Sequence, residues 1–410
     1  MTVPDPPART QSAAALPTLL GVMFINLLGF GIVVPLLPFY AKSFEAPAWQ
    51  IALIFSAYSI GAFFGEPFWG RLSDRVGRKP ILVSTVAGNC LCYLALAFAP
   101  NVYMAFGVRL IGGLASGNGA VIQGYIADVT PPEERTQRMS YLGAAYNLGF
   151  IVGPALGGLL AHPSAGHAGF RLPLLVASGL SALCATGLAL FLRESRKRTA
   201  RFSARPSRFA ALGTALSDPT VSRLMLVTFL GGAVFMGIES IFGLWTQARF
   251  HWGPHQVGTA FAITGVVAAL SQLFVTGPLS RRFSEPAMLS AGMALTAICT
   301  ALQPLSTGGL TVVPLLAVAA FGQSIAWPNV SALISRNVSW EHQGQFLGLN
   351  NATGALARVV GPLCAGLIFS NLGADVPFIV AGLAVVPAIF LARSTRVGEE
   401  PVEAQLSAGE

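Results

Sequence analysis

Three ionisable residues lie deep within long apolar stretches of this 410-residue chain: Arg109, Glu239 and Arg358. A charge is costly to place in hydrocarbon, so such a residue faces a cavity or a partner and marks a candidate functional site. We expect Glu239 to carry a proton, because a carboxyl group in a partly dry cavity can load a proton at one face and release it at the other. Glu239 could instead be a static partner for an arginine. Arg109 and Arg358 could serve proton coupling, substrate binding or the packing of their helices.

A second group of ionisable residues forms the stretch GRLSDRVGRKP (70–80), in which five of eleven residues are charged although only 10% of the chain is. Gly77 is expected to permit a tight turn. Gly70 is expected to let its helix approach a neighbour closely. Asp74 could accept hydrogen bonds from backbone N–H groups at the start of a helix.

The basic residues of this stretch are expected to lie at the lipid headgroups and to pair with nearby acids. Arg75, Arg78 and Lys79 could pair with Asp128, which ends the fourth apolar run. Glu66, one turn before the stretch, is expected to join the same charged cluster. The simpler alternative is that these charges only set the orientation of the chain in a membrane, although an acid such as Asp74 contributes little to that effect.

The sequence offers no other chemistry. Its five cysteines lie in apolar runs without metal-ligand spacing, which is typical of small buried hydrophobic residues. No nucleophile–base pair stands out and no P-loop pattern occurs, so we expect neither an enzyme nor an ATP-driven pump. No metal and no cofactor are expected.

The elements that must position these residues are membrane-spanning helices. Hydrophobic residues make up 53% of the chain and its mean hydropathy is +0.64. About 20 apolar residues are needed to cross the hydrocarbon core, where the helix satisfies its own backbone hydrogen bonds. The sequence contains twelve such runs, at roughly 17–41, 50–69, 81–99, 102–127, 139–161, 172–192, 222–246, 255–278, 286–305, 311–335, 344–370 and 374–392.

The distribution of charge predicts the orientation of these helices. The chain carries a net charge of +8, but its basic residues concentrate in alternate loops, whereas only Lys42, Arg171 and Arg249 fall in the remaining loops. This pattern follows the positive-inside rule and argues against nucleic acid as a partner. We expect both termini in the cytoplasm, and a first helix that is retained because its run is too long for a signal peptide.

Two matched segments divide the chain into halves. GRLSDR (70–75) resembles GPLSRR (277–282) at a spacing of 207, and FIVGPALGGLL (150–160) resembles RVVGPLCAGLI (358–368) at a spacing of 208. This predicts a duplicated six-helix bundle, with bundles at 17–192 and 222–392, a basic linker at 193–221, and cytoplasmic tails at 1–16 and 393–410.

A duplicated bundle places its functional cavity at the interface of the repeats, and rocking of one repeat against the other opens that cavity to each side in turn. Polar and aromatic residues on the helices expected to line the cavity suit a flat amphipathic or cationic compound. These substrate-cavity candidates are Asn26, Asn118, Gln323, Trp327 and Asn329. A tryptophan in such a bundle could also serve packing alone. Trp245, near the end of a run, is typical of an interfacial residue.

The chain resembles the major facilitator superfamily, and within it the twelve-helix drug:proton antiporter group that includes tetracycline efflux proteins. The resemblance lies in GRLSDRVGRKPIL (70–82), GFIVGPALGG (149–158), VRLIGGLASGNGA (108–120) and GFGIVVPLLP (29–38). It implies that the loop motif latches the two halves on the cytoplasmic side while the cavity faces outward. It also implies that the antiporter motif in helix five, with Gly149, Gly153, Pro154, Gly157 and Gly158, shapes the moving interface.

Two positions depart from tetracycline efflux proteins. Asn26 stands where they carry a membrane aspartate in helix one, and Cys92 aligns with their acid in helix three. These departures argue against tetracycline as the substrate. Any proton coupling must then rest on Glu239 or another acid.

The resulting expectation is an all-α, multi-pass inner-membrane carrier that exports small amphipathic molecules or drugs in exchange for protons. Its expected partners are the small-molecule substrate, protons and the lipid bilayer, and it is expected to work as a monomer. One alternative is a metabolite transporter of the same fold, moving a sugar or organic ion by symport or facilitated diffusion. A second is a membrane sensor or scaffold that transports nothing.

Overall fold

The structure is a computed structural model, and it describes residues 9–130, 132–195, 218–338 and 343–395. Most of the predicted linker and of the predicted C-terminal tail, and half of the predicted N-terminal tail, lie outside the described residues. Contacts divide the chain into two units, Met1–Phe202 with Thr246–Ala262, and Ser203–Trp245 with Ile263–Glu410. The first unit therefore takes in a short segment that the sequence places in the second half.

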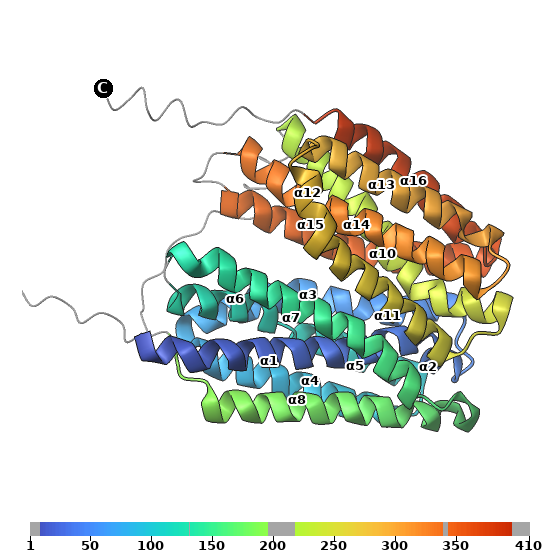
Figure 1. The fold of residues 1–410 in the computed structure, drawn as a ribbon. Helices are drawn as coiled ribbons and strands as arrows, with labels where there is room; N and C mark the ends of the chain where they lie inside the picture. The colour runs from blue at the N-terminus through green and yellow to red at the C-terminus, as the bar shows by residue number, and fades with distance from the viewer. Residues whose placement is uncertain (1–8, 131, 196–217, 339–342, 396–410) are drawn as a thin grey trace, which may run out of the picture. The chain divides into compact units, whose positions relative to one another are not determined.

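The chain folds into helices, and its described residues contain no strand (Figure 1). Eleven helical stretches are long and apolar enough to cross a membrane, and the shorter apolar helix Val102–Ala115 lies in the remaining predicted span. The all-α membrane fold is therefore confirmed. The helices before the linker are α1 (Arg9–Val33), α2 (Leu37–Lys42), α3 (Ala48–Val76), α4 (Arg78–Ala97), α5 (Val102–Ala115), α6 (Asn118–Val129), α7 (Pro132–Leu160) and α8 (Arg171–Phe191).

The helices after the linker follow the same plan. A π-helical turn, Ser271–Val275, joins α11 to α12. The bounds are α10 (Pro219–Phe250), α11 (Pro254–Leu270), α12 (Thr276–Ser280), α13 (Glu285–Leu302), α14 (Gly309–Asn337), α15 (Gln343–Leu372) and α16 (Val376–Arg393).

The predicted helix over 102–127 is wrong in one respect, because it is broken into α5 and α6 at Ser116 and Gly117. A side chain at Gly117 would overlap the ring of Trp69 from α3. The indole Nε1 of Trp69 also donates a hydrogen bond of 2.7 Å to the carbonyl of Leu114 in the last turn of α5. The tryptophan thus packs against the break, with its ring beside Gly117 and its Nε1 bonded to the last turn of α5.

Glycines bring the helices of the first unit into backbone contact. A Cβ at Gly149 would lie 2.7 Å from the Phe24 carbonyl of α1, and a Cβ at Gly153 would lie 2.7 Å from the Cα of Gly31. Gly157 meets Ile32 in the same way. Gly149, Gly153 and Gly157 therefore form a face of α7 that packs on α1, and α1 also contacts α8 (Figure 1).

The second unit repeats this arrangement. A Cβ at Gly237 on α10 would lie 2.8 Å from the carbonyl of Gly361 on α15. Gly153 and Gly361 are matched positions of the two sequence repeats, and their partners Gly31 and Gly237 are separated by a nearly equal offset. The same close approach in each unit is the structural counterpart of the duplication.

Each unit has its own apolar core. Residues of α1, α4, α6, α7 and α8 form one cluster, and residues of α10 and α13 to α16 form the other. Trp245 is fully buried, so the expectation that it lies at a lipid interface is wrong. Its indole Nε1 donates a hydrogen bond of 2.7 Å to Asp375, and its ring packs on Phe378 at 4.6 Å between centroids.

Candidate functional site

Arg109 is buried in the first unit. Asn101 directly precedes α5, and its side chain caps this helix by accepting a hydrogen bond of 2.9 Å from the Met104 N–H. Glycines at 61 and 113 let α3 and α5 approach closely, and this places the ring of Tyr58 under the Arg109 guanidinium, 4.5 Å from Cζ to the ring centroid. Only 5% of Arg109 is exposed, and its Nε has no hydrogen-bond partner among the described residues.

A small cavity of about 10 Å³ adjoins Arg109. This volume takes about one water-sized group. Asn89 lines the cavity and donates a hydrogen bond of 3.3 Å to Asn26 of α1. This bond links Asn26, one of the substrate-cavity candidates, to the site. Cys92 also lines the cavity. The remaining lining residues are Tyr58, Tyr93, Leu96, Val108 and Gly112.

Glu239 lies in the second unit on α10, eleven residues before the end of this 32-residue helix. Its side chain is half-buried, and within the described part of the chain it has neither a hydrogen-bond nor an ion-pair partner. Arg358 lies on α15 and is also half-buried. No ion pair joins the two among the described residues, so Glu239 is not held there as the static partner of Arg358.

The other substrate-cavity candidates differ in how their polar groups are used. Asn118 is buried at the start of α6, where its Oδ1 accepts from the Gly119 N–H while its Nδ2 lacks a partner among described residues. Asn329 is buried and donates to the Ile325 carbonyl of its own helix at 2.7 Å. Gln323 and Trp327 are both half-buried on α14.

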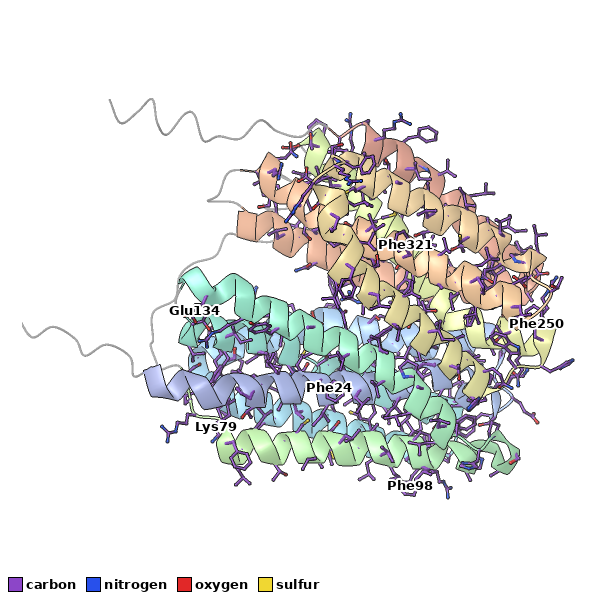
Figure 2. All side chains as sticks on the ribbon, viewed as in Figure 1. Phe24, Lys79, Phe98, Glu134, Phe250 and Phe321 are labelled. Atoms are coloured by element: carbon purple, nitrogen blue, oxygen red, sulfur yellow. The ribbon has the colours of Figure 1, made fainter. Side chains whose placement is uncertain are left out.

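The stretch 70–80 forms a charged network around Arg78, whose side chain is only 9% exposed. Its guanidinium pairs with Asp74 at 2.9 Å and with Asp128 of α6 at 3.1 Å, and it donates to the Ser73 hydroxyl at 2.7 Å. The expected pairing between this loop and Asp128 is therefore present. Lys79, the second residue of α4, and Glu134 of α7 lie toward the same end of this unit (Figure 2).

One expectation for the loop is wrong. Gly70 has nothing within 4 Å of the position of a Cβ, so among the described residues it serves no close helix approach. The backbone N–H groups that begin α4 are held by Glu194, whose Oε1 and Oε2 accept hydrogen bonds from Arg78 at 2.8 Å and Lys79 at 3.1 Å. The carboxylate of Asp74 pairs with the side chain of Arg78. Glu66 is exposed on α3, and Arg75 is exposed at the end of that helix.

Glu194 belongs to a short segment after α8 that crosses the end of this unit and that the sequence reasoning missed. The carbonyl of Arg193 accepts a hydrogen bond of 2.7 Å from the Tyr125 hydroxyl. The Ser195 hydroxyl donates a hydrogen bond of 3.4 Å to the carboxylate of Asp128. The sequence signal that could have indicated this segment is Glu194 itself, an acidic residue at the start of a mainly basic linker. The segment binds the end of α8 to the charged network.

The antiporter motif lies on α7. Gly149, Gly153 and Gly157 face α1. Gly158 instead packs against the start of α11, where a Cβ added to Gly158 would lie 2.6 Å from the carbonyl oxygen of Pro254. Pro154 lies inside α7, which continues past it. The motif thus provides backbone-level contacts on two sides of one helix.

Two units of apolar helices, a repeated glycine contact and charged residues buried at membrane depth define a multi-pass membrane transporter. The sequence profile of the Major Facilitator Superfamily matches residues 19–253 and 224–410. The chain belongs to this superfamily, and its relatives confirm the resemblance to the drug:proton antiporter group.

Three of these relatives cover most of the chain. The tetracycline resistance protein, class C, of Escherichia coli is 31% identical over 88% of this chain and 91% of its own length. Multidrug resistance protein 2 of Bacillus subtilis (strain 168) is 26% identical over 90% of this chain and 92% of its own. Among solved structures, the human organic anion transporter MFSD10 (TETRAN) is 25% identical with a TM-score of 0.68, covering 92% of this chain and 99% of that one.

Proposed function

We propose that this protein is a secondary active transporter that exports small amphipathic molecules or drugs in exchange for protons, by alternating access. The names of its relatives, which include tetracycline, multidrug and quinolone resistance proteins, support drug export. The observation that carries proton coupling is Glu239, a carboxyl group at membrane depth with no fixed partner among the described residues.

Glu239 is the proposed proton carrier. A carboxyl group locked in an ion pair would resist protonation, whereas one without such a partner can change its charge during each cycle. Arg109 and Arg358 are the other candidates for coupling, because each places a permanent positive charge within a spanning helix. Asn26, Asn118, Gln323, Trp327 and Asn329 are the proposed contributors to the substrate cavity.

The charged network around Arg78 is the proposed cytoplasmic latch. Its residues are Glu66, Gly70, Asp74, Arg75, Gly77, Arg78, Lys79 and Asp128, and Glu194 joins them through its hydrogen bonds to the start of α4. Transport requires the latch to open and re-form in each cycle. Since its basic residues set the orientation, both termini face the cytoplasm of an inner membrane, and the monomer is the working unit.

The test measures accumulation of fluorescent cationic and neutral drugs, and of tetracycline, in pump-deficient cells that express the wild-type protein or Glu239→Gln. Glu285→Gln is the matched control, because Glu285 is an acid at the end of a helix of the same unit, paired with Arg336 at 3.0 Å. We expect wild type and the control to lower accumulation of at least one compound, and a protonophore or Glu239→Gln to restore it. Equal accumulation of every compound with and without the protein would contradict drug export.

A further inference from the structure

The guanidinium of Arg109 is a buried cation that forms no ion pair with any described residue. It is 5% exposed, its Nε lacks a hydrogen-bond partner among the described residues, and its only described contact with an aromatic ring is the face of Tyr58. Buried polar atoms in native proteins nearly always have partners, and a buried charge without one is especially costly. The missing partner of Nε is a hydrogen-bond acceptor, because an arginine N–H can only donate.

The helices around Arg109 supply no carboxylate that could fill this role. Helices α1, α4, α5 and α8 contain no Asp or Glu. Helix α3 does, but Glu66 lies eight residues beyond Tyr58, about 12 Å along the axis, and Asp74 pairs with Arg78. The counter-charge at this depth of the first unit must therefore come from outside it.

The cavity beside Arg109 is suited to such a group. Its lining is largely apolar, and it also includes Asn89, Cys92 and Tyr93 beside Arg109 and Tyr58, around a space of about 10 Å³. That space takes about one water-sized group. A carboxylate oxygen or a halide ion presents a single acceptor atom of about this size.

We propose that this cavity binds a monovalent anionic group, which accepts a hydrogen bond from the Nε–H of Arg109 and neutralises its guanidinium. Two sources share this chemistry: a free inorganic anion such as chloride, and the carboxylate end of an organic anion. The second source rests on the proposed transport function, since it makes Arg109 a substrate-recognising residue. The first does not.

Binding is measured on the purified full-length protein in chloride-free lipid nanodiscs, without any proton gradient. The probes are chloride, acetate and benzoate, and the readout is the thermal unfolding temperature as a function of anion concentration. Arg109→Gln is compared with Arg171→Gln, a matched control because Arg171 also lies over an aromatic ring, 5.6 Å from that of Phe98, but is exposed. We expect saturable stabilisation in wild type and Arg171→Gln, and at least tenfold weaker apparent affinity in Arg109→Gln.

A second measurement uses the wild-type protein alone and does not depend on a variant that folds. N-ethylmaleimide alkylation of Cys92, which lines the cavity, is followed by peptide mass spectrometry, with the exposed Cys364 as the internal control. We expect a bound anion to slow labelling of Cys92 severalfold and to leave labelling of Cys364 unchanged.

Protection by chloride as well as by carboxylates would establish the cavity as a site for free anions. Protection by acetate or benzoate alone would assign it to the carboxylate of an organic ligand. If no anion protects Cys92 or stabilises the wild-type protein, the proposal is overturned. Since neither measurement requires transport, absence of proton-coupled export in cells would leave this result intact.

Discussion

The carboxylate of Glu194 occupies the space that a side chain at Gly77 would need. A Cβ on Gly77 would lie 2.5 Å from Oε2 of Glu194, although the two residues are far apart in the sequence. Gly77 also has a φ of +116°, a backbone conformation that residues with a side chain rarely adopt. Two separate restraints therefore require glycine between α3 and α4.

Gly77→Ala should destabilise the protein by about 1–3 kcal/mol, because it adds backbone strain and displaces Glu194 from the N–H groups of Arg78 and Lys79. The measurement is the thermal unfolding temperature of the purified protein. Gly70→Ala is the control, since nothing lies within 4 Å of its Cβ position. Equal unfolding temperatures for the two variants would contradict the restraint.

Glu194→Ala should reduce the penalty of Gly77→Ala, because the carboxylate that blocks the new methyl group is then absent. The two substitutions are expected to be non-additive by about 0.5–1 kcal/mol, as neighbouring sites that share a contact usually are. A double-mutant cycle of unfolding temperatures checks this. Simple additivity would mean that backbone strain alone excludes a side chain at this position.

Arg78→Lys should not restore the charged network. The guanidinium contacts Asp74, Asp128 and the Ser73 hydroxyl at once, and a lysine ammonium cannot reproduce this planar arrangement of donors. We expect Arg78→Lys to lower drug export and stability nearly as much as Arg78→Ala. Lys79→Arg serves as the comparison, and wild-type export by Arg78→Lys would refute a geometric role for the guanidinium.

Gly153→Ala should separate α1 from α7. Its methyl group would lie 2.7 Å from the Cα of Gly31, a backbone atom that cannot move aside alone. Overpacking of this kind costs about 1–3 kcal/mol. The measurement is the amount of folded protein recovered after heating, by size-exclusion chromatography. Gly143→Ala, in the same helix but with open space at its Cβ position, should behave as wild type.

Trp245→Phe should destabilise the second unit more than Asp375→Asn. The phenylalanine removes the indole donor and leaves the Asp375 carboxylate without this hydrogen bond, whereas asparagine keeps an acceptor oxygen at 2.7 Å from Nε1. Loss of one such bond costs about 1 kcal/mol. Thermal unfolding compares the two variants, and the reverse order would show that the charge of Asp375 contributes more than its hydrogen bond from Trp245.

Much of the fold could be predicted from the sequence because a membrane imposes a simple length rule. An apolar run of about 20 residues forms a helix wherever it occurs, since its backbone has no other hydrogen-bond partner in lipid. The rule fails at Ser116 and Gly117, where the helix breaks and Trp69 of another helix leaves no room for a side chain at Gly117. Apolar length carries no information about that contact.

The candidate site, like the fold, could be predicted from the sequence only in part. The ion pair between Arg78 and Asp128 was expected, because both residues lie at helix termini that the sequence places at the same membrane face. Glu194 was missed, since its hydrogen bonds to α4 join residues more than a hundred positions apart. The sequence predicts that Glu239 and Arg358 lie on spanning helices. It does not predict that the two residues form no ion pair with each other, which the described residues show.

The sequence by itself determined the spanning helices, the duplication and the superfamily, because these are written in apolar length, repeated spacing and motifs along the chain. Only the tertiary structure decided that Trp245 is buried, that Glu194 caps α4, and that Arg109 adjoins a small cavity and forms no ion pair with any described residue. The physical reason is that burial and partnership depend on which helix faces are brought together by glycine contacts, and these faces come from distant parts of the chain.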